Sequence, residues 1–417
     1  MDRASASNVK LISGRCPPGR LFCSKCGCAK ICEVAVKLAK AYLDKRLQNR
    51  YYAYRTTLRE YARRRKIIFN GGYKMKTLVY EGPKTVAVHD DYAIPELKSG
   101  EVRIKVTYCG ICGSDIGIFL GTHPRAKAPL VLGHEFIGVI EDMKDCKGKF
   151  KVGDRVSAYP LLSCGECFAC KTGIPHVCQS LKLIGIDCDG GIAEYVNCSE
   201  DVIFKIDDAV SDKAAAVIEP LAVVLRSLHQ ANFQAYDSTV VVGAGPIGIL
   251  TGILLRYCGA SQVIISDVDP ARLEMCRELG MDAVNVKETD LLAYVKEKTN
   301  GVGVDIVFEC SGAAPAAMQC VDLCRIQGTI CMTGVHKYPH EVNLRDLNFK
   351  EQTMVGTRVY TLREFEQAVE MTKDPVFAAA LEKTVTNIVP IDESDKVFDM
   401  IADPNINTVK VVVDCRA

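Results

Sequence analysis

One stretch, from Thr239 to Asp267, constrains the fold of this chain more than any other. It contains two short apolar segments, each of a kind that forms a buried β-strand, joined by a longer apolar segment with helical character. Three consecutive valines lead into Gly-Ala-Gly-Pro-Ile-Gly, and the second apolar segment ends at Asp267. A strand, a tight glycine turn, a helix and a second strand make a βαβ unit, so the stretch predicts an α/β fold with a doubly wound parallel sheet.

The glycines and the aspartate of this unit are typical of a dinucleotide site. Gly243 allows a sharp turn, Gly245 lets the backbone approach a pyrophosphate, and Gly248 lets the helix pack closely on the strand. Asp267 can accept hydrogen bonds from a ribose 2′-hydroxyl and would repel a 2′-phosphate. The order of these features favours NAD over NADP as the ligand; the alternative is a tight turn in some other α/β protein.

The segments before this unit have the pattern of a compact, mostly antiparallel β domain. Short β runs separated by Gly, Pro and Asp follow Met75, and a helical pattern near residues 210–230 has Ser211 as a candidate N-cap and Pro220 as an internal break. The expected strands are Thr77–Tyr80, Val102–Val106, Gly138–Glu141 and Arg155–Ala158.

The segments after the unit predict a sheet and then a return. Strands and helices alternate from Thr239 to about Gly356, as in a parallel sheet. A helix at Leu362–Met371, a short β run at Ile388–Ile391 and a strand at Thr408–Val413 follow. We expect this tail to pack back on the first domain.

Charge separates the first 74 residues from the rest, since their net charge is +14 and that of residues 75–417 is −13. We weigh three interpretations of this extension: a small zinc-binding or nucleic-acid-binding module, a mitochondrial address, and an upstream region that is not translated, with translation starting at Met75. We favour the third and expect no nucleic-acid partner. Intact-mass analysis of the native protein distinguishes them.

The composition indicates the cellular compartment and the chemical state of the cysteines. No apolar run reaches membrane-spanning length, so we expect no membrane partner. The chain has 21 cysteines and no secretory signal, which indicates reduced thiols and metal ligands, hence a cytoplasmic protein.

The strongest local metal signal is a group of four cysteines in a polar, glycine-containing loop. Their spacing is x2, x2 and x7, and four thiolates can close a tetrahedron around Zn²⁺. Four protein ligands leave no open position, so this site is predicted to be structural. The residues are Cys164, Cys167, Cys170 and Cys178.

A second set of candidate ligands is dispersed along the chain. Cys112 and His134 offer sulfur and nitrogen, and Glu135 or Glu219 offers oxygen. A catalytic zinc takes about three protein ligands and keeps one open position. Pro220 is expected to kink its helix and hold Glu219 out of register. Spacing alone leaves open the alternatives of a satisfied core histidine and a solvated glutamate.

These motifs together resemble the zinc-containing medium-chain dehydrogenase/reductase family, over residues 75–417. The motifs are Gly110-Ile-Cys-Gly-Ser-Asp115, Gly133-His-Glu135, the four cysteines, Glu219-Pro220 and the glycine turn with Asp267. The resemblance implies a GroES-like β-rich catalytic domain and a Rossmann domain. We therefore divide the chain into an extension (1–74), a GroES-like catalytic domain (75–231), an NAD-binding Rossmann domain (232–357) and a C-terminal return (358–417).

The resemblance also implies roles for single residues. Cys112, His134 and Glu219 would hold the catalytic zinc, with Glu135 beside the metal as an alternate ligand. Asp115 would orient the ligand histidine, and Ser114 would pass the substrate proton towards solvent. Two zinc ions per chain are expected, one catalytic and one structural, and Arg272 joins the predicted cofactor contacts.

The implied activity is hydride transfer from a secondary hydroxyl of a polyol, vicinal diol or sugar acid to NAD⁺. Glu219 replaces the cysteine of typical alcohol dehydrogenases, as in the branch of sorbitol, butanediol and threonine dehydrogenases. Gly117 stands where many threonine dehydrogenases carry a histidine, which weakens the interpretation as a threonine dehydrogenase. L-threonine 3-dehydrogenase is therefore kept only as the alternative within this class. A zinc-free quinone reductase or a non-catalytic binding protein is the alternative of another class.

Two further expectations concern the substrate and the assembly. Arg358 can bind several hydroxyls or a carboxylate as a planar fork, or it can pair at the surface with Glu364 or Glu366. The expected partner is a small-molecule alcohol, and relatives of this kind are usually homodimers or homotetramers.

Overall fold

The structure, a computed structural model, describes residues 73–416. The predictions made for the basic extension therefore lie outside the described residues, apart from its last two positions. Within residues 73–416, no helix combines the length and the apolar character needed to cross a membrane.

The predicted parallel sheet is present and has six strands in the order β13-β12-β11-β14-β15-β16. Every neighbouring pair in it is parallel. The chain order therefore reverses next to β11, and such a switch point places a crevice at the carboxyl ends of the strands. The strands are β11 (Ser238–Val242), β12 (Gln262–Asp267), β13 (Asp282–Asn285), β14 (Val304–Glu309), β15 (Cys324–Met332) and β16 (Thr353–Gly356).

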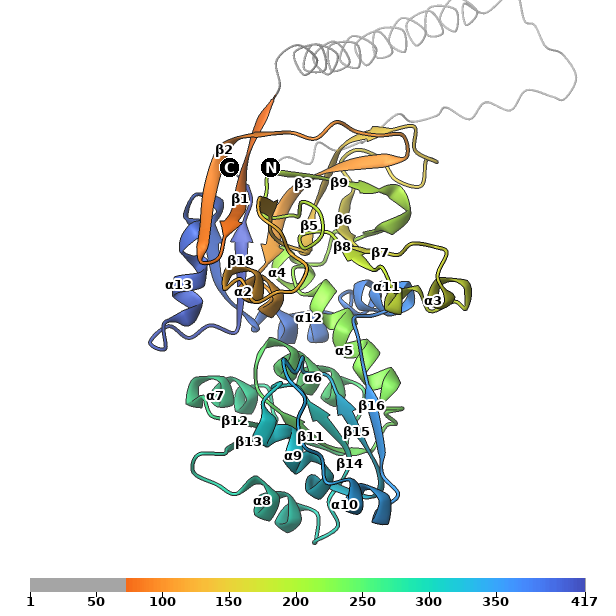
Figure 1. The fold of residues 1–417 in the computed structure, drawn as a ribbon, viewed down its shortest axis with the longest axis vertical. Coiled ribbons are helices and arrows are strands. Elements are labelled where there is room, and N and C mark those ends of the chain that lie inside the picture. Colours follow the sequence, from red (N-terminus) through yellow and green to blue (C-terminus); the bar gives the residue numbers. More distant parts are fainter. Residues whose placement is uncertain (1–72, 417) are drawn as a thin grey trace, which may run out of the picture. The chain divides into compact units, whose positions relative to one another are not determined.

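Helices flank this sheet, as Figure 1 shows. The first of them, α6, follows the glycine turn directly. Its buried residues include Ile249, Leu250 and Leu254, which belong to the main hydrophobic core. The helices are α6 (Pro246–Tyr257), α7 (Pro270–Glu278), α8 (Leu291–Lys298), α9 (Ala314–Leu323) and α10 (Leu344–Phe349).

The β-rich part contains a seven-stranded sheet and a three-stranded sheet. All four strands predicted before residue 160 are confirmed, and their pairing is antiparallel. The larger sheet contains β3 (Glu101–Gly110), β5 (Glu135–Lys144), β6 (Arg155–Ala158), β9 (Tyr195–Ser199), β10 (Ile203–Lys205), β17 (Val385–Pro390) and β18 (Lys410–Asp414), and the smaller one contains β1 (Lys74–Gly82), β2 (Thr85–Ala93) and β4 (Leu130–Val131).

Short elements lie between these strands. Strands β7 (Leu161–Leu162) and β8 (Lys182–Leu183) pair with each other and flank the loop that carries the four cysteines. The short helical elements are α2 (Gly113–Phe119), α3 (Phe168–Lys171), η1 (Pro175–Val177) and η2 (Glu200–Val202).

The helical segment before the parallel sheet differs from the expectation in one respect. Ser211 is an N-cap, as predicted, and its hydroxyl accepts a hydrogen bond from the Ala214 N–H at 3.2 Å. The predicted break at Pro220 is wrong, because α4 (Asp212–Ala215) ends earlier and α5 (Ile218–Gln230) begins before the proline. Pro220 lies in the first turn of α5, where a backbone N–H has no partner within the helix.

The tail returns to the β-rich part, as expected. Strand β18 pairs antiparallel with β3, and its Val412 lies opposite Gly110. The predicted helix at Leu362–Met371 is α11. Three further helical elements of the tail are not predicted from the sequence: α12 (Pro375–Glu382), η3 (Ile391–Lys396) and α13 (Val397–Ala402).

Candidate active site

The pairing of β3 with β5 brings the dispersed metal ligands together. Gly110 ends β3 opposite Glu135, which begins β5. Cys112 lies two residues beyond the end of β3, and His134 directly precedes β5. The ligand atoms of Cys112, His134 and Glu135 consequently all lie within 4.8 Å of one another. Sulfur, imidazole nitrogen and carboxylate oxygen together are a donor set that fits zinc.

A buried lysine neutralises one of these ligands. Lys410, at the start of β18, forms an ion pair with Glu135, and both side chains are 2% exposed. The Lys410 ammonium also donates to the Ile111 carbonyl at 3.0 Å. A side chain at Gly110 would overlap both partners, so glycine there makes room for the pair. The charge of Lys410 offsets the cost of burying the carboxylate.

Asp115 and Ser114 support the same site from α2. Asp115 is fully buried and accepts the Cys112 N–H at 2.9 Å, which fixes the backbone of the cysteine. Its other oxygen lies 3.9 Å from Nδ1 of His134, close enough for charge attraction but beyond a hydrogen bond. The Ser114 hydroxyl is buried and has no hydrogen-bond partner among the described residues.

Glu219 lies near these residues but outside the three-residue ligand group. It occupies the first turn of α5, where a negative charge is favourable, and it is 7% exposed. The hydroxyl of buried Tyr360 donates to its Oε1 at 2.5 Å. Burial, together with the charge of Glu135, raises the pKa of Glu219 to about 7. The sequence motifs predict Glu219 on the metal and Glu135 beside it, whereas the structure groups Glu135 with Cys112 and His134.

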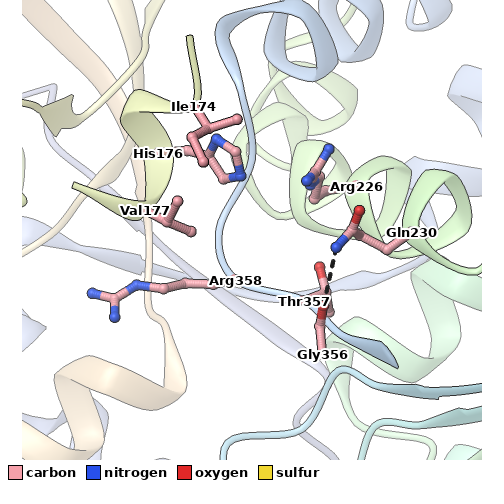
Figure 2. Close-up of a pocket in the computed structure, with 8 residues that line it drawn as sticks. All are labelled: Ile174, His176, Val177, Arg226, Gln230, Gly356, Thr357 and Arg358. Carbon is pink, nitrogen blue, oxygen red and sulfur yellow. Dashed lines mark hydrogen bonds between the residues drawn. The ribbon is translucent and has the colours of Figure 1, made fainter. Parts of the chain in front are cut away.

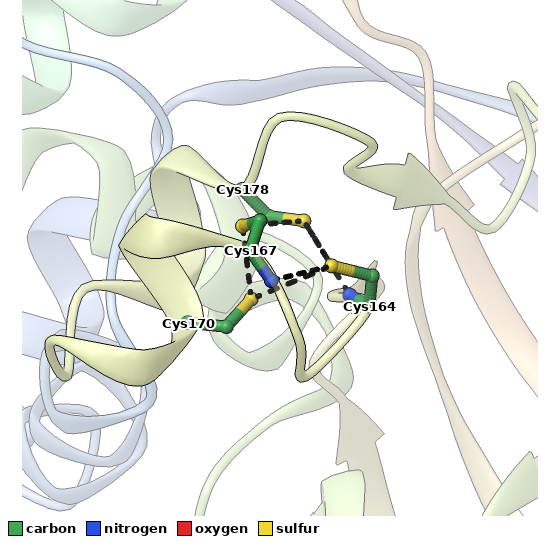
Figure 3. Close-up of side chains that lie close together, drawn as sticks. All are labelled: Cys164, Cys167, Cys170 and Cys178. Atoms are coloured by element: carbon green, nitrogen blue, oxygen red, sulfur yellow. Dashed lines mark hydrogen bonds between the residues drawn. The ribbon is translucent and has the colours of Figure 1, made fainter.

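The four cysteines of the loop form a compact group (Figure 3). The shortest sulfur separations are 3.5 Å, for Cys167–Cys170 and for Cys164–Cys178. Sulfurs at the corners of a tetrahedron with Zn–S of about 2.3 Å lie about 3.8 Å apart, so the group has the size of a zinc site. Hydrogen bonds from the backbone N–H groups of Glu166 and Cys167 lower the pKa of Cys164 to about 6, which favours the thiolate.

The glycine turn forms the predicted βαβ connection. Gly243 follows β11 with a φ of +103°, and Gly245 is the N-cap of α6. A side chain at Gly248 would collide with the Gly243 carbonyl, whereas one at Gly245 would meet nothing within 4 Å. The helix N-terminus therefore faces open space of the kind that a pyrophosphate fills.

Asp267 lies beside this turn at the end of β12. One of its oxygens accepts the Ala244 N–H at 2.6 Å, and the other accepts the N–H groups of Val268 and Asp269. The contact with Ala244 holds the carboxylate against the glycine turn. Arg272, in α7, lies 3.6 Å from Asp269 and donates to the carbonyl of Thr408.

Arg358 belongs to neither group of candidate metal ligands. It is exposed, follows β16 and lines a cavity between that segment and the cysteine loop. Among the described residues it forms no ion pair with its predicted surface partners, Glu364 and Glu366; Glu364 pairs instead with Arg226 and His229.

Two residues of the site were missed by the sequence analysis. A lysine within a valine-rich strand is typical of an exposed position, and only the pairing of β18 with β3 places Lys410 beside Glu135. Tyr360 follows Arg358 closely, but no local pattern connects it with Glu219, 141 residues away.

Comparisons with known proteins agree with this arrangement. The family model described as the alcohol dehydrogenase GroES-like domain matches residues 98–208, and the model described as zinc-binding dehydrogenase matches residues 246–374. The chain is 33% identical to 2-dehydro-3-deoxy-L-galactonate 5-dehydrogenase of Pseudoalteromonas atlantica over 339 residues, 81% of this chain and 98% of the relative. It is 36% identical to a sorbitol dehydrogenase of Halalkalibacterium halodurans over 305 residues, 72% and 88% of the two chains.

Solved structures are similar over the same region. A zinc-binding dehydrogenase from Sinorhizobium meliloti bound to NADP has a TM-score of 0.76 and 29% identity, covering 82% of this chain and 99% of that one. An alcohol dehydrogenase of Escherichia coli CFT073 complexed with NADH has a TM-score of 0.75 and 29% identity, covering 82% and 100%. Relatives of this fold thus bind either nicotinamide dinucleotide.

Proposed function

Because the chain belongs to the zinc-containing medium-chain dehydrogenase family and is a zinc-dependent alcohol oxidoreductase, we propose that it oxidises a secondary hydroxyl of a polyol, vicinal diol or sugar acid. The observation that carries this proposal is the gathering of Cys112, His134 and Glu135, with Glu219 beside them. The named relatives act on a sugar acid and on sorbitol, which supports the substrate class.

We further propose NAD⁺ as the hydride acceptor. The Asp267 carboxylate accepts three backbone N–H groups, one of them from Ala244 in the glycine turn, and offers a negative charge where a 2′-phosphate would approach. Steady-state rates with NAD⁺ and NADP⁺ test this proposal, and an equal preference would contradict it. The aspartate-neutralising variant Asp267→Asn is expected to improve the relative rate with NADP⁺.

The other residues of the site have separate roles in the proposed reaction. Cys112, His134 and an acid would hold zinc, which would act as a Lewis acid and lower the pKa of a substrate hydroxyl. The unpartnered Ser114 hydroxyl is available to take the proton of the substrate and hand it towards solvent. Asp115 keeps the backbone of Cys112 in place, and Lys410 neutralises Glu135.

The substitution Cys112→Ser tests the metal assignment. We expect zinc to fall from two ions per chain to one and turnover to fall by at least about 100-fold, because a serine hydroxyl is a poor zinc ligand. NADH binding, followed by fluorescence, should persist. Cys188→Ser is the matched control, since Cys188 lies outside both candidate metal groups. Turnover that survives in Cys112→Ser would refute the assignment.

A substrate screen separates this proposal from its alternatives. NAD⁺ reduction is measured with polyols, vicinal diols, sugar acids and L-threonine. Preference for threonine would favour L-threonine 3-dehydrogenase, the alternative within the class. A chain with one zinc, in the cysteine loop alone, and no alcohol oxidation would favour a quinone reductase or a binding protein.

We also propose a homodimer or homotetramer in the cytoplasm. Strand β16 is the last strand at one edge of the six-stranded sheet, so a second copy can pair with it. Every cysteine of residues 73–416 is free, which supports a reducing compartment. Sedimentation analysis measures the oligomeric state, and a monomer would exclude this assembly.

A further inference from the structure

A cavity of about 420 Å³ lies outside the groups of metal ligands. Its walls come from η1 of the cysteine loop, from the C-terminal half of α5, and from the segment Gly356–Arg358 that follows β16 (Figure 2). These segments are far apart in sequence. The cavity therefore exists only in the folded chain.

Three buried polar atoms around this cavity lack a hydrogen-bond partner among the described residues. They are Nδ1 of His176, Nε of Arg226 and Oγ1 of Thr357. His176 as a whole is 3% exposed. Buried polar groups nearly always have a partner in folded proteins. Three such atoms belong to residues that line one cavity, and a polar ligand would satisfy them once the side chains that carry them turn towards it.

The charge of the lining identifies the sign of that ligand. Two arginines line the cavity, Arg226 and Arg358, and no acidic residue among residues 73–416 does. Glu364 lies next to Arg226, at 3.5 Å from one terminal nitrogen, but it also accepts from His229 and Thr361. The five donors of the Arg226 guanidinium are thus only partly used. A lining with positive charge and unused hydrogen-bond donors favours an oxyanion as the ligand.

The side chains that line the cavity differ in orientation, in hydrogen bonding and in charge. In Figure 2 the guanidinium of Arg358 points away from Arg226, and Gln230 donates to the Gly356 carbonyl at 3.1 Å. Burial and the charge of Arg226 lower the pKa of His176. A neutral imidazole can donate one hydrogen bond to an oxyanion, so Arg226 supplies the fixed charge.

The cavity lies along the same helix face as Glu219. Residues 219, 223, 226 and 230 follow one another at intervals of three or four, so their side chains share a face of α5. Arg226 is two turns beyond Glu219, about 10 Å along the helix axis. Arg358 is two residues before Tyr360, which donates to Glu219. Each arginine therefore lies on the same helix or chain segment as a residue of the proposed active site.

We propose that this cavity is an anion subsite, in which Arg226, His176 and Thr357 bind the carboxylate or phosphate of an acidic alcohol substrate. The inference rests on the proposed function and narrows it, because it selects sugar acids or phosphorylated polyols over neutral polyols. Arg358 covers the bound anion once its side chain turns inward.

The experiment compares two substrates of equal carbon number, a neutral polyol and the corresponding sugar acid. We expect wild type to prefer the acid, and we expect Arg226→Met to lower the ratio of kcat/KM for acid to that for polyol by about tenfold or more, through KM. Thr357→Val, a nearly isosteric change, should lower the ratio by about threefold. Arg363→Met is the matched control, because Arg363 is exposed on α11 and outside the cavity.

Inorganic phosphate distinguishes the substrate's own anion from a separate one. It should inhibit competitively against the sugar acid, and this inhibition should weaken in Arg226→Met. Phosphate that binds without competing with the acid would overturn the subsite, as would an unchanged ratio in folded Arg226→Met and Thr357→Val. If neither substrate is oxidised by wild type, the proposed function fails; if the polyol is oxidised without preference for the acid, only the subsite fails.

Discussion

At Glu219, burial and a neighbouring negative charge act in the same direction. Burial, together with the Glu135 carboxylate, raises its pKa to about 7, and the Tyr360 hydroxyl donates the one side-chain hydrogen bond recorded for it in the described part of the chain. A carboxylate that is hard to ionise without a cation becomes easy to ionise when a cation binds nearby. The free-energy cost of burying an ionised Glu219 should therefore fall when a metal ion binds nearby.

The first prediction concerns Tyr360→Phe. Removing the hydroxyl leaves a buried carboxyl oxygen without its donor, so the free energy of unfolding should fall by about 1–3 kcal/mol. Tyr159→Phe is the matched control, because Tyr159 is also buried and its hydroxyl makes only a long contact, 3.4 Å, with the Tyr360 carbonyl. Urea unfolding measures both variants. Equal losses would mean that packing, and not the bond to Glu219, determines the effect.

A second prediction concerns the pH dependence of zinc binding at the catalytic site. The metal-free pKa of Glu219 is about 7, so below that pH the carboxyl carries a proton that a nearby cation displaces. Affinity therefore falls as the pH is lowered through 7. Between pH 8 and pH 6, wild type should lose about tenfold more affinity than Glu219→Gln, which has no proton to release.

Chelator competition at pH 6, 7 and 8 measures this difference. The other ligands also release protons, but they do so in both proteins, so the comparison isolates Glu219. If zinc affinity depends on pH equally in wild type and in Glu219→Gln, then Glu219 does not lose a proton on zinc binding in this pH range.

At the scale of elements, the sequence predicted what local patterns determine. The βαβ unit has both a β-branched strand and a glycine turn, and the predicted strand Arg155–Ala158 and helix Leu362–Met371 coincide with β6 and α11. Helix α12 was missed although Asp374-Pro375 is a typical helix start, with the aspartate as N-cap. The error at Pro220 arose because a proline can either break a helix or lie in its first turn, and local sequence does not decide between them.

Two features of the site depend on pairing between strands that are distant in sequence, which local sequence patterns do not reveal. Glu135 rather than Glu219 lies with Cys112 and His134 because β3 and β5 pair with Gly110 opposite Glu135. Lys410 arrives only through β18, the last strand of the chain. The assignment of each residue to metal, cofactor or substrate stays a prediction, although the four cysteines do form the compact group that their spacing indicated.

The third prediction concerns the cysteine loop as an element. Helix α3 has four residues and η1 has three, so neither is stable without other support. In Cys170→Ser, zinc should fall from two ions per chain to one, and limited proteolysis should cut within residues 164–178. Cys188→Ser should keep both ions and resist cleavage. An uncut Cys170→Ser protein would show that the loop is held by packing alone.

At the scale of the whole molecule, the candidate metal ligands and the dinucleotide turn belong to different sheets. The ligands lie around β3 and β5, and the turn follows β11. Helix α5 carries Glu219, contacts α6 and α11, and lies between the two sheets in Figure 1. The main hydrophobic cluster includes Ile104 from one sheet and Ile265 from the other. A substitution in α5 therefore affects both partners of the proposed hydride transfer.

The last prediction is that a chain beginning at Met75 folds and works as the full chain does. All the site residues lie after this point, and β1 keeps its pairing with β2 from Met75 onwards, where Met75 lies opposite Tyr92. The truncation removes the Lys74–Asp91 ion pair, whose side chains are 60% and 62% exposed, and a pair so exposed contributes at most about 1 kcal/mol. Turnover should match that of the full chain, and the free energy of unfolding should fall by no more than that amount.

A chain beginning at Lys98, where the first family match starts, is the control. It lacks β1 and β2, and with them the buried side chains of Leu78 and Tyr80, so we expect it not to fold. Circular dichroism and gel filtration follow both chains. A Met75 chain that fails like the Lys98 chain would show that the basic extension supports the catalytic part. A Met75 chain that matches the full protein would mean that the +14 charge of the first 74 residues has no part in catalysis.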